Sequence, residues 1–344
     1  MIADRLAART LELVDIPSES LREDAIASHV TTVLREGGLD VHDLGDACVY
    51  ARPVGSAPRI LLAGHFDTVP AQGNVPGSRD GERVHGLGAS DMKGALAVMI
   101  ELGLAGIDFG LVFFPREELP VHQSALTPLL ERERTLLDAD LAVVMEPTDN
   151  TLHVGCLGNV NATWVFHGRS GHSARPWLAD NAIERAAAGV SAFAREPLAH
   201  AFDGLEFMEV ASVTGISGGI ARNVIPDRVE CLVNYRYPPG ITPAEAEERL
   251  IERCGGHGEL LIEANAPSGP SAMGNPLVAA LRGLGNLDVA PKQAWTPVAE
   301  FAMAGIDAIN FGPGAPAQAH RKDESIEIAA LARSYEVLEA FGRR

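Results

Sequence analysis

The chain has 344 residues, more than one typical hydrophobic core accommodates, so two domains are expected. Its 46 acidic residues outnumber the 28 lysines and arginines and give a formal net charge of −18, which disfavours nucleic acid as a partner. No apolar run reaches the ~18 residues of a membrane span, and no signal-peptide core is present, so we expect neither a membrane partner nor secretion.

The four cysteines are far apart in the sequence and form no C-x-x-C pair: Cys48, Cys156, Cys231 and Cys254. This spacing disfavours both a zinc–cysteine site and a disulfide framework. Reduced thiols and a cytoplasmic location are therefore expected.

Helix and strand patterns alternate in the first part of the chain. Ser20 and Glu23 fit a capping box that opens a helix ending at residues 37–38. Further on, the pattern predicts a helix at 93–102 and strands at 41–44, 49–52, 60–63, 109–114 and 141–145. The last three strands are almost continuously apolar, which is typical of strands buried on both faces. We therefore predict an α/β sheet covered by helices.

The middle of the chain has a different pattern, β-α-β-β-α-β, which is the order of a ferredoxin-like module. Its predicted elements are strands at 163–167, 209–213, 229–235 and 260–263, and helices at 180–195 and 242–255. Helix–strand alternation then resumes, with a strand at 308–311 and a last helix at 325–341. We expect an α/β domain formed by residues 1–160 and 268–344, with an α+β domain of residues 161–267 inserted into it.

Ionisable side chains recur where the predicted strands end, the edge at which an α/β sheet forms its site. They are His65 and Asp67, Asp91 in a glycine-rich loop, the pair Glu117 and Glu118, Glu146, and His320. Each residue alone has an ordinary structural explanation. Together, carboxylates at one edge would repel one another and raise their pKa values, and a cation removes that cost. Histidine nitrogen with carboxylate oxygen suits Zn²⁺, and a water on such a metal ionises near neutral pH.

These motifs resemble the signature of the dinuclear zinc amidohydrolase family, which includes desuccinylases, deacetylases, aminoacylases and carboxypeptidases. The matching segments, in chain order, are "HFDTVP" at 65–70, "GLGASDMKG" at 86–94, the adjacent glutamates, "EPT" at 146–148 and the late histidine. Residues 155–183 and 223–239 are most similar to the actinobacterial succinyl-diaminopimelate desuccinylase branch. The resemblance implies a zinc-peptidase-like α/β/α catalytic domain with an inserted ferredoxin-like lid and dimerisation domain.

The resemblance also implies a role for each residue of the motifs. His65 and Glu146 would hold one zinc ion, His320 and Glu118 a second, and Asp91 would bridge both. Cobalt could substitute for zinc. Asp67 would orient His65, the usual partner of a metal-bound imidazole. Glu117 would be the general base that takes a proton from water and carries it to the leaving amine.

Further expectations concern the inserted domain and the substrate. His172 would stabilise the oxyanion in the active site of a neighbouring subunit, which implies a homodimer formed through the inserted domain. Asn223 and Arg236 match positions near the substrate, and the planar fork of Arg suits a carboxylate. Gly312 and Gly314 would allow backbone to approach the substrate closely.

One segment departs from the family pattern. "WTPVAEF" carries Pro297 and Glu300 where the similar branch commonly has Asp and Arg. Replacing a cation by an acid there could alter recognition of a substrate carboxylate, or lower activity outright.

Competing functions are weaker. The glycine-rich loop lacks the third glycine of G-x-G-x-x-G and follows no buried strand, which disfavours a dinucleotide enzyme. No G-x-S-x-G elbow occurs, which disfavours a serine hydrolase. The expected function is zinc-dependent hydrolysis of N-succinyl-LL-2,6-diaminopimelate, a small-molecule N-acyl amino acid, for lysine and diaminopimelate synthesis. The alternatives are another deacylase, dipeptidase or carboxypeptidase of this family, or a metal-binding relative without turnover.

Overall fold

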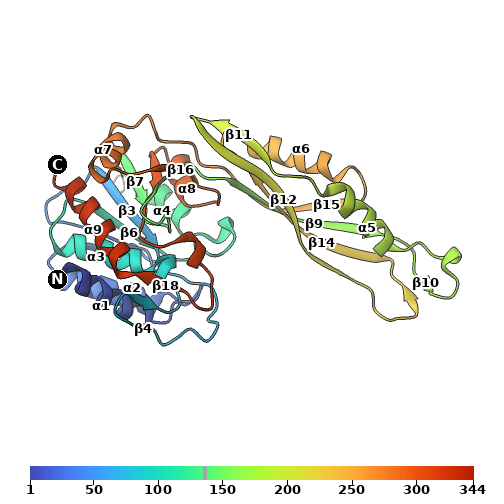
Figure 1. Cartoon of the computed structure of the whole chain (residues 1–344), viewed down its shortest axis with the longest axis horizontal. Helices are drawn as coiled ribbons and strands as arrows, with labels where there is room; N and C mark the ends of the chain where they lie inside the picture. The colour runs from blue at the N-terminus through green and yellow to red at the C-terminus, as the bar shows by residue number, and fades with distance from the viewer. Residues whose placement is uncertain (135–137) are drawn as a thin grey trace. The chain divides into compact units, whose positions relative to one another are not determined.

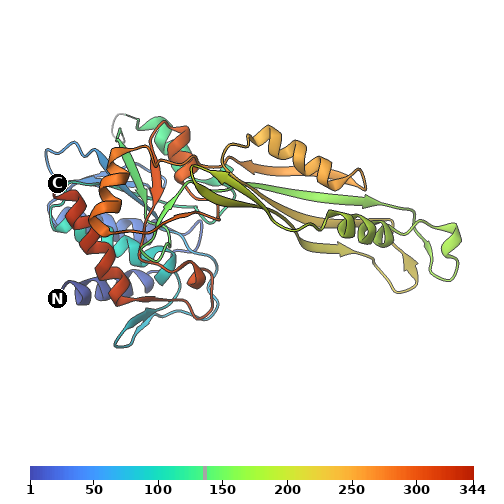
Figure 2. The same ribbon diagram turned by 45° about the horizontal axis from the view of Figure 1, so that its top comes forward.

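The computed structural model describes residues 1–134 and 138–344, and its chain divides into two compact units. Unit 1 comprises Met1–Gly155, Ser271–Lys292 and Thr296–Arg344, whereas unit 2 comprises Cys156–Pro270 and Gln293–Trp295. Figures 1 and 2 show helices and sheet strands throughout both units. The predicted fold class, an α/β unit interrupted by an α+β unit, is confirmed. The short return of the chain at Gln293–Trp295 to unit 2 was not indicated by the sequence.

The centre of unit 1 is an eight-stranded mixed sheet in the order β1-β2-β6-β3-β7-β17-β8-β16. Its strands are β1 (Asp40–Asp43), β2 (Val49–Arg52), β3 (Ile60–His65), β6 (Gly110–Phe114), β7 (Leu141–Val144), β8 (Leu152–Val154), β16 (Val289–Pro291) and β17 (Ala308–Asn310). Strand β3 runs parallel to both β6 and β7, and all three are buried along their whole length. The residues that follow these three strands therefore meet at one edge of the sheet.

Helices cover this sheet. Those of unit 1 are α1 (Ile2–Val14), α2 (Asp24–Glu36), α3 (Gly94–Leu104), α4 (Leu126–Arg132), α7 (Pro276–Gly285), α8 (Val298–Met303) and α9 (Ile328–Gly342). Helices α1, α3 and α9 pack on one another, and α8 packs against β7, β17 and α4 (Figure 1). A small sheet of β18 (Ser325–Glu327), β5 (Arg83–His85) and β4 (Ser78–Arg79) completes the unit.

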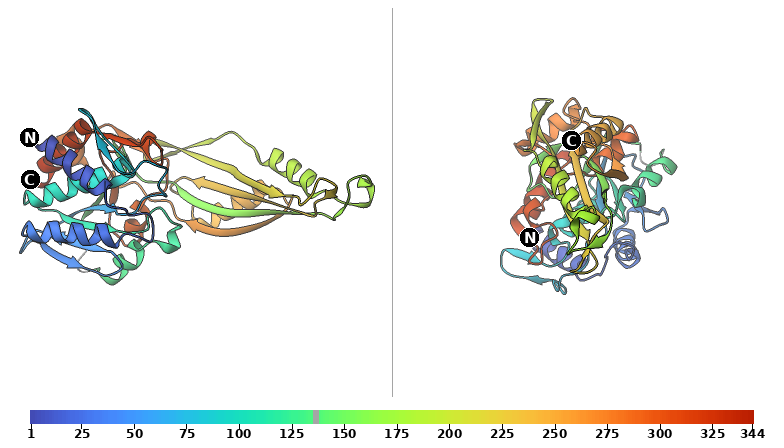
Figure 3. Two further views of the ribbon diagram at one scale, coloured as in Figure 1. Left: turned by 90° about the horizontal axis from the view of Figure 1, so that it is seen from below. Right: turned by 90° about the vertical axis from the view of Figure 1, so that its right-hand side faces the viewer.

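Unit 2 is built on a five-stranded antiparallel sheet in the order β11-β12-β14-β9-β15. Figure 3 shows the long strands of this unit from two further sides. Its elements are β9 (Gly158–His167), α5 (Ala182–Phe193), β11 (Leu198–Phe202), β12 (Leu205–Gly218), β14 (Arg228–Tyr237), α6 (Pro243–Cys254) and β15 (Glu259–Ala266), with a separate pair formed by β10 (Gly171–His172) and β13 (Val224–Ile225). Without β11, the sheet has the strand order of the predicted ferredoxin-like module.

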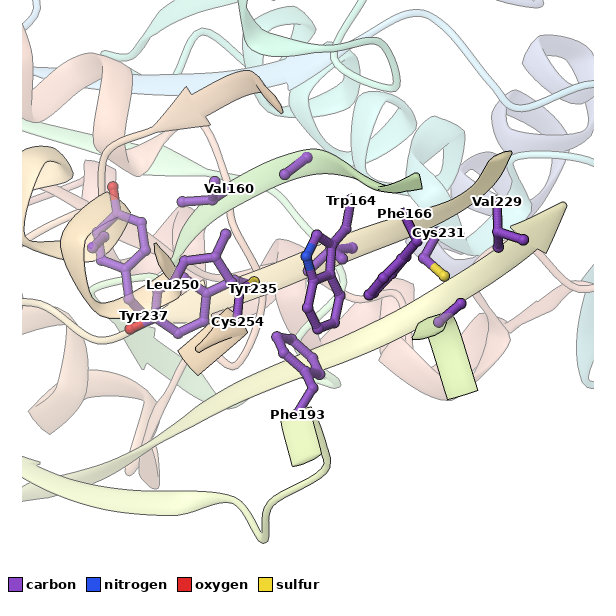
Figure 4. Packing of buried hydrophobic residues seen from close by; sticks show 14 of the residues in the cluster. Val160, Trp164, Phe166, Phe193, Val229, Cys231, Tyr235, Tyr237, Leu250 and Cys254 are labelled. Atoms are coloured by element: carbon purple, nitrogen blue, oxygen red, sulfur yellow. The ribbon is translucent and has the colours of Figure 1, made fainter. Parts of the chain in front are cut away.

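An aromatic group forms part of the core of unit 2 (Figure 4). The Trp164 ring lies 4.5 Å from the Phe166 ring and 5.6 Å from the Phe193 ring, centroid to centroid. Alternate side chains of β9 and β14 point into this core, as the two-residue period of a strand requires. The helix α6 begins with a capping box between Thr242 and Glu245.

Two sequence-based details were wrong. Helix α2 begins at Asp24 without a side-chain cap, because the Ser20 hydroxyl donates to Asp67 Oδ2 at 2.8 Å instead of capping a helix. The last helix begins at Ile328, because residues 325–327 pair with β5 as strand β18.

Among the described residues, no helix is both long and apolar enough to cross a bilayer. All four cysteines are buried and none of them forms a disulfide.

Candidate metal centre

The carboxyl ends of β3, β6 and β7 bring the predicted ligands together. His65 is the last residue of β3, Glu117 and Glu118 follow β6, and Glu146 follows β7. The remaining two ligands lie on loops, Asp91 in an irregular turn before α3 and His320 after β17. Because the side chains come from adjacent strand ends and two neighbouring loops, five residues distant in sequence form one cluster. These are His65, Asp91, Glu118, Glu146 and His320.

A first group of ligand atoms surrounds His65, which is 1% exposed. Its Nε2 atom lies 3.3 Å from Asp91 Oδ1 and 3.7 Å from Glu146 Oε1. One ligand atom from each of these three residues lies within 4.8 Å of the others. The group therefore offers one nitrogen and two oxygens to a single ion.

A second group surrounds His320, whose side chain is 54% exposed. Its Nε2 atom lies 3.0 Å from Glu118 Oε1 and 3.5 Å from Asp91 Oδ2. These three residues also place one ligand atom each within 4.8 Å of one another. Asp91 thus belongs to both groups through different oxygens, so the cluster extends from a buried position to one that solvent reaches.

Asp67 holds both the first histidine and the glutamate pair. His65 Nδ1 lies 2.9 Å from the Asp67 carbonyl oxygen and 3.4 Å from its Oδ1. The Asp67 carboxylate also accepts hydrogen bonds from the backbone N–H groups of Glu117, at 3.0 Å, and Glu118, at 3.1 Å. A donor Nδ1–H leaves Nε2 of His65 available to a metal.

The carboxylates of the cluster carry more negative charge than the protein compensates. Burial and the charge of Asp91 raise the pKa of Glu146 to about 7. Burial and the charge of Glu146 raise the pKa of Glu117 well above its usual range. Burial also disfavours ionised Asp91, but its hydrogen bond to His65 together with the charges of His65, His320 and Lys292 outweighs burial and lowers its pKa.

Both histidines bind protons more tightly than usual. The hydrogen bond to Glu118 raises the pKa of His320 to about 9. Burial opposes a charge on His65, but its hydrogen bonds to Asp67 and Asp91 outweigh burial and raise its pKa. Without cations, the cluster therefore compensates its negative charge with extra protons.

The donor set fits two divalent cations. Imidazole nitrogen and carboxylate oxygen are ligands of zinc, and a carboxylate can bridge two ions. Glu146 Oε1 is buried and has no hydrogen-bond partner among the residues that the structure describes. Such a buried acceptor, 3.7 Å from His65 Nε2, fits a cation that both atoms would bind. Glu117 lies beside the ligands, with an oxygen within 4.8 Å of donor atoms of His65 and Glu118.

Two residues near the cluster were missed by the sequence reasoning. Lys292 is 7% exposed, its Nζ lies 3.8 Å from Glu146 Oε2, and it donates to the Pro147 carbonyl at 3.0 Å. Glu324 is buried and accepts hydrogen bonds from the loop that carries Asp91. No spacing rule marks a buried lysine, whereas Glu324 could have been noticed because it closely follows His320.

His172, Asn223 and Arg236 belong to unit 2. The pairing of β10 with β13 brings the first two together, since the Ser173 N–H donates to the Asn223 carbonyl at 3.0 Å. His172 is exposed, and its Nδ1 accepts the Ala174 N–H at 3.0 Å, so the neutral ring carries its proton on Nε2. Arg236 lies on β14 and donates from Nε to Asn234 Oδ1 at 2.9 Å.

Gly312 and Gly314 make close approaches within the protein. A Cβ on Gly312 would lie 2.2 Å from the Met145 carbonyl oxygen, and one on Gly314 would lie 2.1 Å from the Ser90 carbonyl oxygen. Any side chain at these positions would displace the segments that carry Glu146 and Asp91. Their contact with substrate stays a prediction.

Pro297 and Glu300, the residues that depart from the family pattern, have structural roles. Pro297 precedes α8 as its N-cap residue. Glu300 is 2% exposed, and its Oε1 accepts hydrogen bonds from the Ser124 hydroxyl at 2.8 Å and the Thr127 hydroxyl at 2.7 Å. The acid is therefore turned into the core beside α4 and does not present its charge to solvent.

Comparisons with known proteins identify the family of the chain. Residues 61–344 match the model of peptidase family M20/M25/M40. The DapE protein of Mycobacterium tuberculosis is 34% identical over 340 residues, 96% of each chain. The succinyl-diaminopimelate desuccinylase of Corynebacterium glutamicum is 33% identical over 95% of this chain and 94% of its own. An M20 family metallo-carboxypeptidase of Sulfolobus solfataricus shares the fold, with a TM-score of 0.79, 18% identity and 99% of each chain covered. The chain belongs to peptidase family M20/M25/M40.

Proposed function

We propose that the protein is a metal-dependent amidohydrolase that cleaves N-succinyl-LL-2,6-diaminopimelate into succinate and LL-2,6-diaminopimelate. The observation that carries this proposal is the similarity to the Corynebacterium desuccinylase along nearly the whole chain. The clustered histidines and carboxylates support it, because they supply what hydrolysis of an amide requires.

The cofactor in this proposal is zinc, two ions per subunit, with cobalt as a substitute. His65 and Glu146 would hold one ion, Glu118 and His320 would hold the other, and Asp91 would contribute to both. Divalent cations at these positions supply Lewis acidity and lower the pKa of water. The side chains of the protein then orient the substrate and move the protons.

Glu117 is the proton carrier in this mechanism. It lies beside the ligand atoms of His65 and Glu118, and its backbone is held by Asp67. Its carboxylate takes a proton from the attacking water and delivers it to the nitrogen of the departing amine. Adjacent glutamates thus have separate tasks, Glu118 as a ligand and Glu117 as a base.

Unit 2 supplies the remaining polar groups. Arg236 binds a substrate carboxylate through its planar fork, and Asn223 binds the substrate nearby. The Nε2–H of His172 donates to the oxyanion in the active site of a second copy, so the working form is a homodimer joined through unit 2. Gly312 and Gly314 line the substrate. The reaction takes place in the cytoplasm, which agrees with the absence of disulfides among the four cysteines.

The deciding experiment measures turnover of a panel of N-succinyl, N-acetyl and dipeptide substrates, before and after chelation and after zinc is restored. We expect hydrolysis of N-succinyl-LL-2,6-diaminopimelate to exceed the others, to stop with the chelator and to return with zinc. Preference for an acetyl or dipeptide substrate would assign another activity of the family. Bound metal without turnover across the panel would indicate a non-catalytic relative, and turnover that survives complete removal of metal would refute the mechanism.

A further inference from the structure

Glu324 connects two loops of the metal centre. Its side chain is buried, with the residue 2% exposed, and its carboxylate accepts three backbone hydrogen bonds. The donors are the N–H groups of Gly88, at 2.8 Å, Ser90, at 2.8 Å, and Asp91, at 2.9 Å. One of these donors is the amide of the residue that belongs to both ligand groups.

The backbone of Glu324 adds to this connection. Its carbonyl accepts the Gly86 N–H at 3.0 Å, so a single residue receives four hydrogen bonds from residues 86–91. The Ser90 hydroxyl also donates to the Ala315 carbonyl at 3.1 Å. The loop that carries Asp91 is therefore bonded to the segment that carries His320.

The two ligand groups differ in how they are supported. His65 ends a buried strand and Glu146 closely follows another, so their positions are fixed by the sheet. Asp91 and His320 both lie on loops, and His320 has a left-handed backbone with φ 62°, which a non-glycine residue keeps only where its surroundings hold it. The second ligand group thus depends on loop contacts much more than the first.

A carboxylate at this place also has an electrostatic cost. When it is ionised, Glu324 adds a negative charge next to a cluster that already contains several carboxylates. Three N–H donors compensate part of that cost, because charge-assisted hydrogen bonds are the stronger kind. A neutral side chain would avoid the repulsion, which indicates that the carboxylate is used to fix the donors in place.

We propose that Glu324 is a positioning residue for the ion held by Asp91, Glu118 and His320. By joining residues 86–91 to the segment after His320, it keeps Oδ2 of Asp91 and Nε2 of His320 at the distance that one ion requires. This inference rests on the proposed two-metal function, and it adds a residue that touches neither ion nor substrate.

Glu324→Gln tests the proposal, because the amide keeps the size of the side chain but opposes an N–H donor with its own NH₂ group. The chelated chain is titrated with Zn²⁺ by calorimetry, and the number of ions retained after dialysis is measured. We expect the original chain to bind two ions. In the variant, one ion should bind about 10- to 100-fold more weakly, the range for residues that orient ligands. The other ion, which Asp91 also holds, should lose less affinity, because His65 and Glu146 are fixed by the sheet.

Glu300→Gln is the matched control. Glu300 is equally buried, at 2% exposed, and accepts the Thr127 N–H at 3.1 Å as well as two hydroxyls. Replacing the Glu300 carboxylate by an amide should lower the melting temperature of the metal-free chain but leave both zinc affinities unchanged. A purely structural role for Glu324 would give the same pattern as this control.

The outcomes separate the inference from the proposed function. If the original chain and Glu324→Gln both bind two ions with equal affinities, the inference is wrong and the proposed function stands. If the original chain binds no zinc, the proposed function and the inference both fail. If Glu324→Gln does not fold, Glu324→Asp keeps the charge but shortens the side chain, and the same selective weakening of one ion is required of it.

Discussion

Asp91 faces two histidines with different oxygens, Oδ1 at 3.3 Å from His65 Nε2 and Oδ2 at 3.5 Å from His320 Nε2. The two histidines are separated in sequence by most of the chain, yet one carboxylate lies between them. In the proposed function Asp91 is a ligand shared by two ion positions, which makes these positions interdependent, whereas each histidine serves only one of them.

Asp91→Ala should therefore reduce zinc binding at both positions, to less than one ion per chain after dialysis. His65→Ala and His320→Ala should each retain one ion, because each removes a ligand of one group only. Metal analysis of the dialysed proteins checks this, with the exposed Asp203→Ala as a control that keeps two ions. Retention of two tightly bound ions by Asp91→Ala would exclude Asp91 as the shared ligand.

Glu117→Gln should slow turnover about 10²- to 10⁴-fold, the range of general acid–base catalysis, while zinc content stays at two ions. Glu118→Gln is the matched neighbour, and it should lose one ion because Glu118 Oε1 lies 3.0 Å from His320 Nε2. Steady-state kinetics and metal analysis of both variants separate the two roles. A loss of zinc in Glu117→Gln would make Glu117 a ligand instead of the base.

The strand ends could be predicted from the sequence because apolar runs followed by His or acid residues are local signals. β3, β6 and β7 are buried on both faces, so their sequences are continuously apolar and easy to recognise. The meeting of His65 with Glu146 follows from the parallel neighbours β3 and β7. Sheet topology thus explains why the candidate ligands at the strand ends lie together.

Other features depend on tertiary contacts that no local pattern encodes. Ser20 and Glu23 have the spacing of a capping box, but Ser20 bonds instead to Asp67, 47 residues away in the chain. The sequence predicts an altered substrate loop at Glu300, but its spacing does not indicate that the carboxylate accepts hydrogen bonds from Ser124 and Thr127. Both residues have polar partners that sequence spacing alone could not identify.

Lys292→Met should destabilise the metal-free chain, because it removes the buried cation 3.8 Å from Glu146 Oε2. Breaking a buried ion pair costs about 3 kcal/mol or more when the remaining charge stays uncompensated. Bound zinc would compensate the negative charge of Glu146. The substitution should therefore lower the free energy of unfolding less in the metal-loaded protein than in the metal-free protein. Urea unfolding with and without chelator measures both values, and the exposed Lys322→Met is the control. An equal fall in the free energy of unfolding, with and without metal, would contradict the pairing of Lys292 with Glu146.

His153 should make the metal-free protein less stable in acid. Burial and the charge of Lys292 lower its pKa from the ordinary 6.5 to about 4. Between these values the unfolded chain takes up a proton that the folded chain does not, so the free energy of unfolding falls as pH falls from 6.5 to about 4.

His153→Phe removes this titration, and its unfolding free energy should fall less steeply across the same pH range. Urea unfolding of the metal-free chain at several pH values gives the two slopes. His257→Phe, at an exposed position, should keep the slope of the original chain. Parallel curves for His153→Phe and the original chain would show that His153 titrates normally.

Mixing two inactive variants tests whether His172 acts on a second copy. His172→Ala lacks the oxyanion donor but keeps the metal ligands of unit 1, whereas His320→Ala lacks a ligand but keeps His172 in unit 2. If His172 works across a dimer, half of the active sites in a mixed dimer combine intact ligands with an intact histidine. Turnover should then recover on mixing, toward about half of the original rate per dimer, because transition-state donors contribute about 10²- to 10³-fold. Mixed dimers are verified by differently tagged copies, and mixing His320→Ala with His65→Ala is the control, since no site in that mixture has a complete ligand set. Verified mixed dimers without recovery would show that His172 does not act on a second copy.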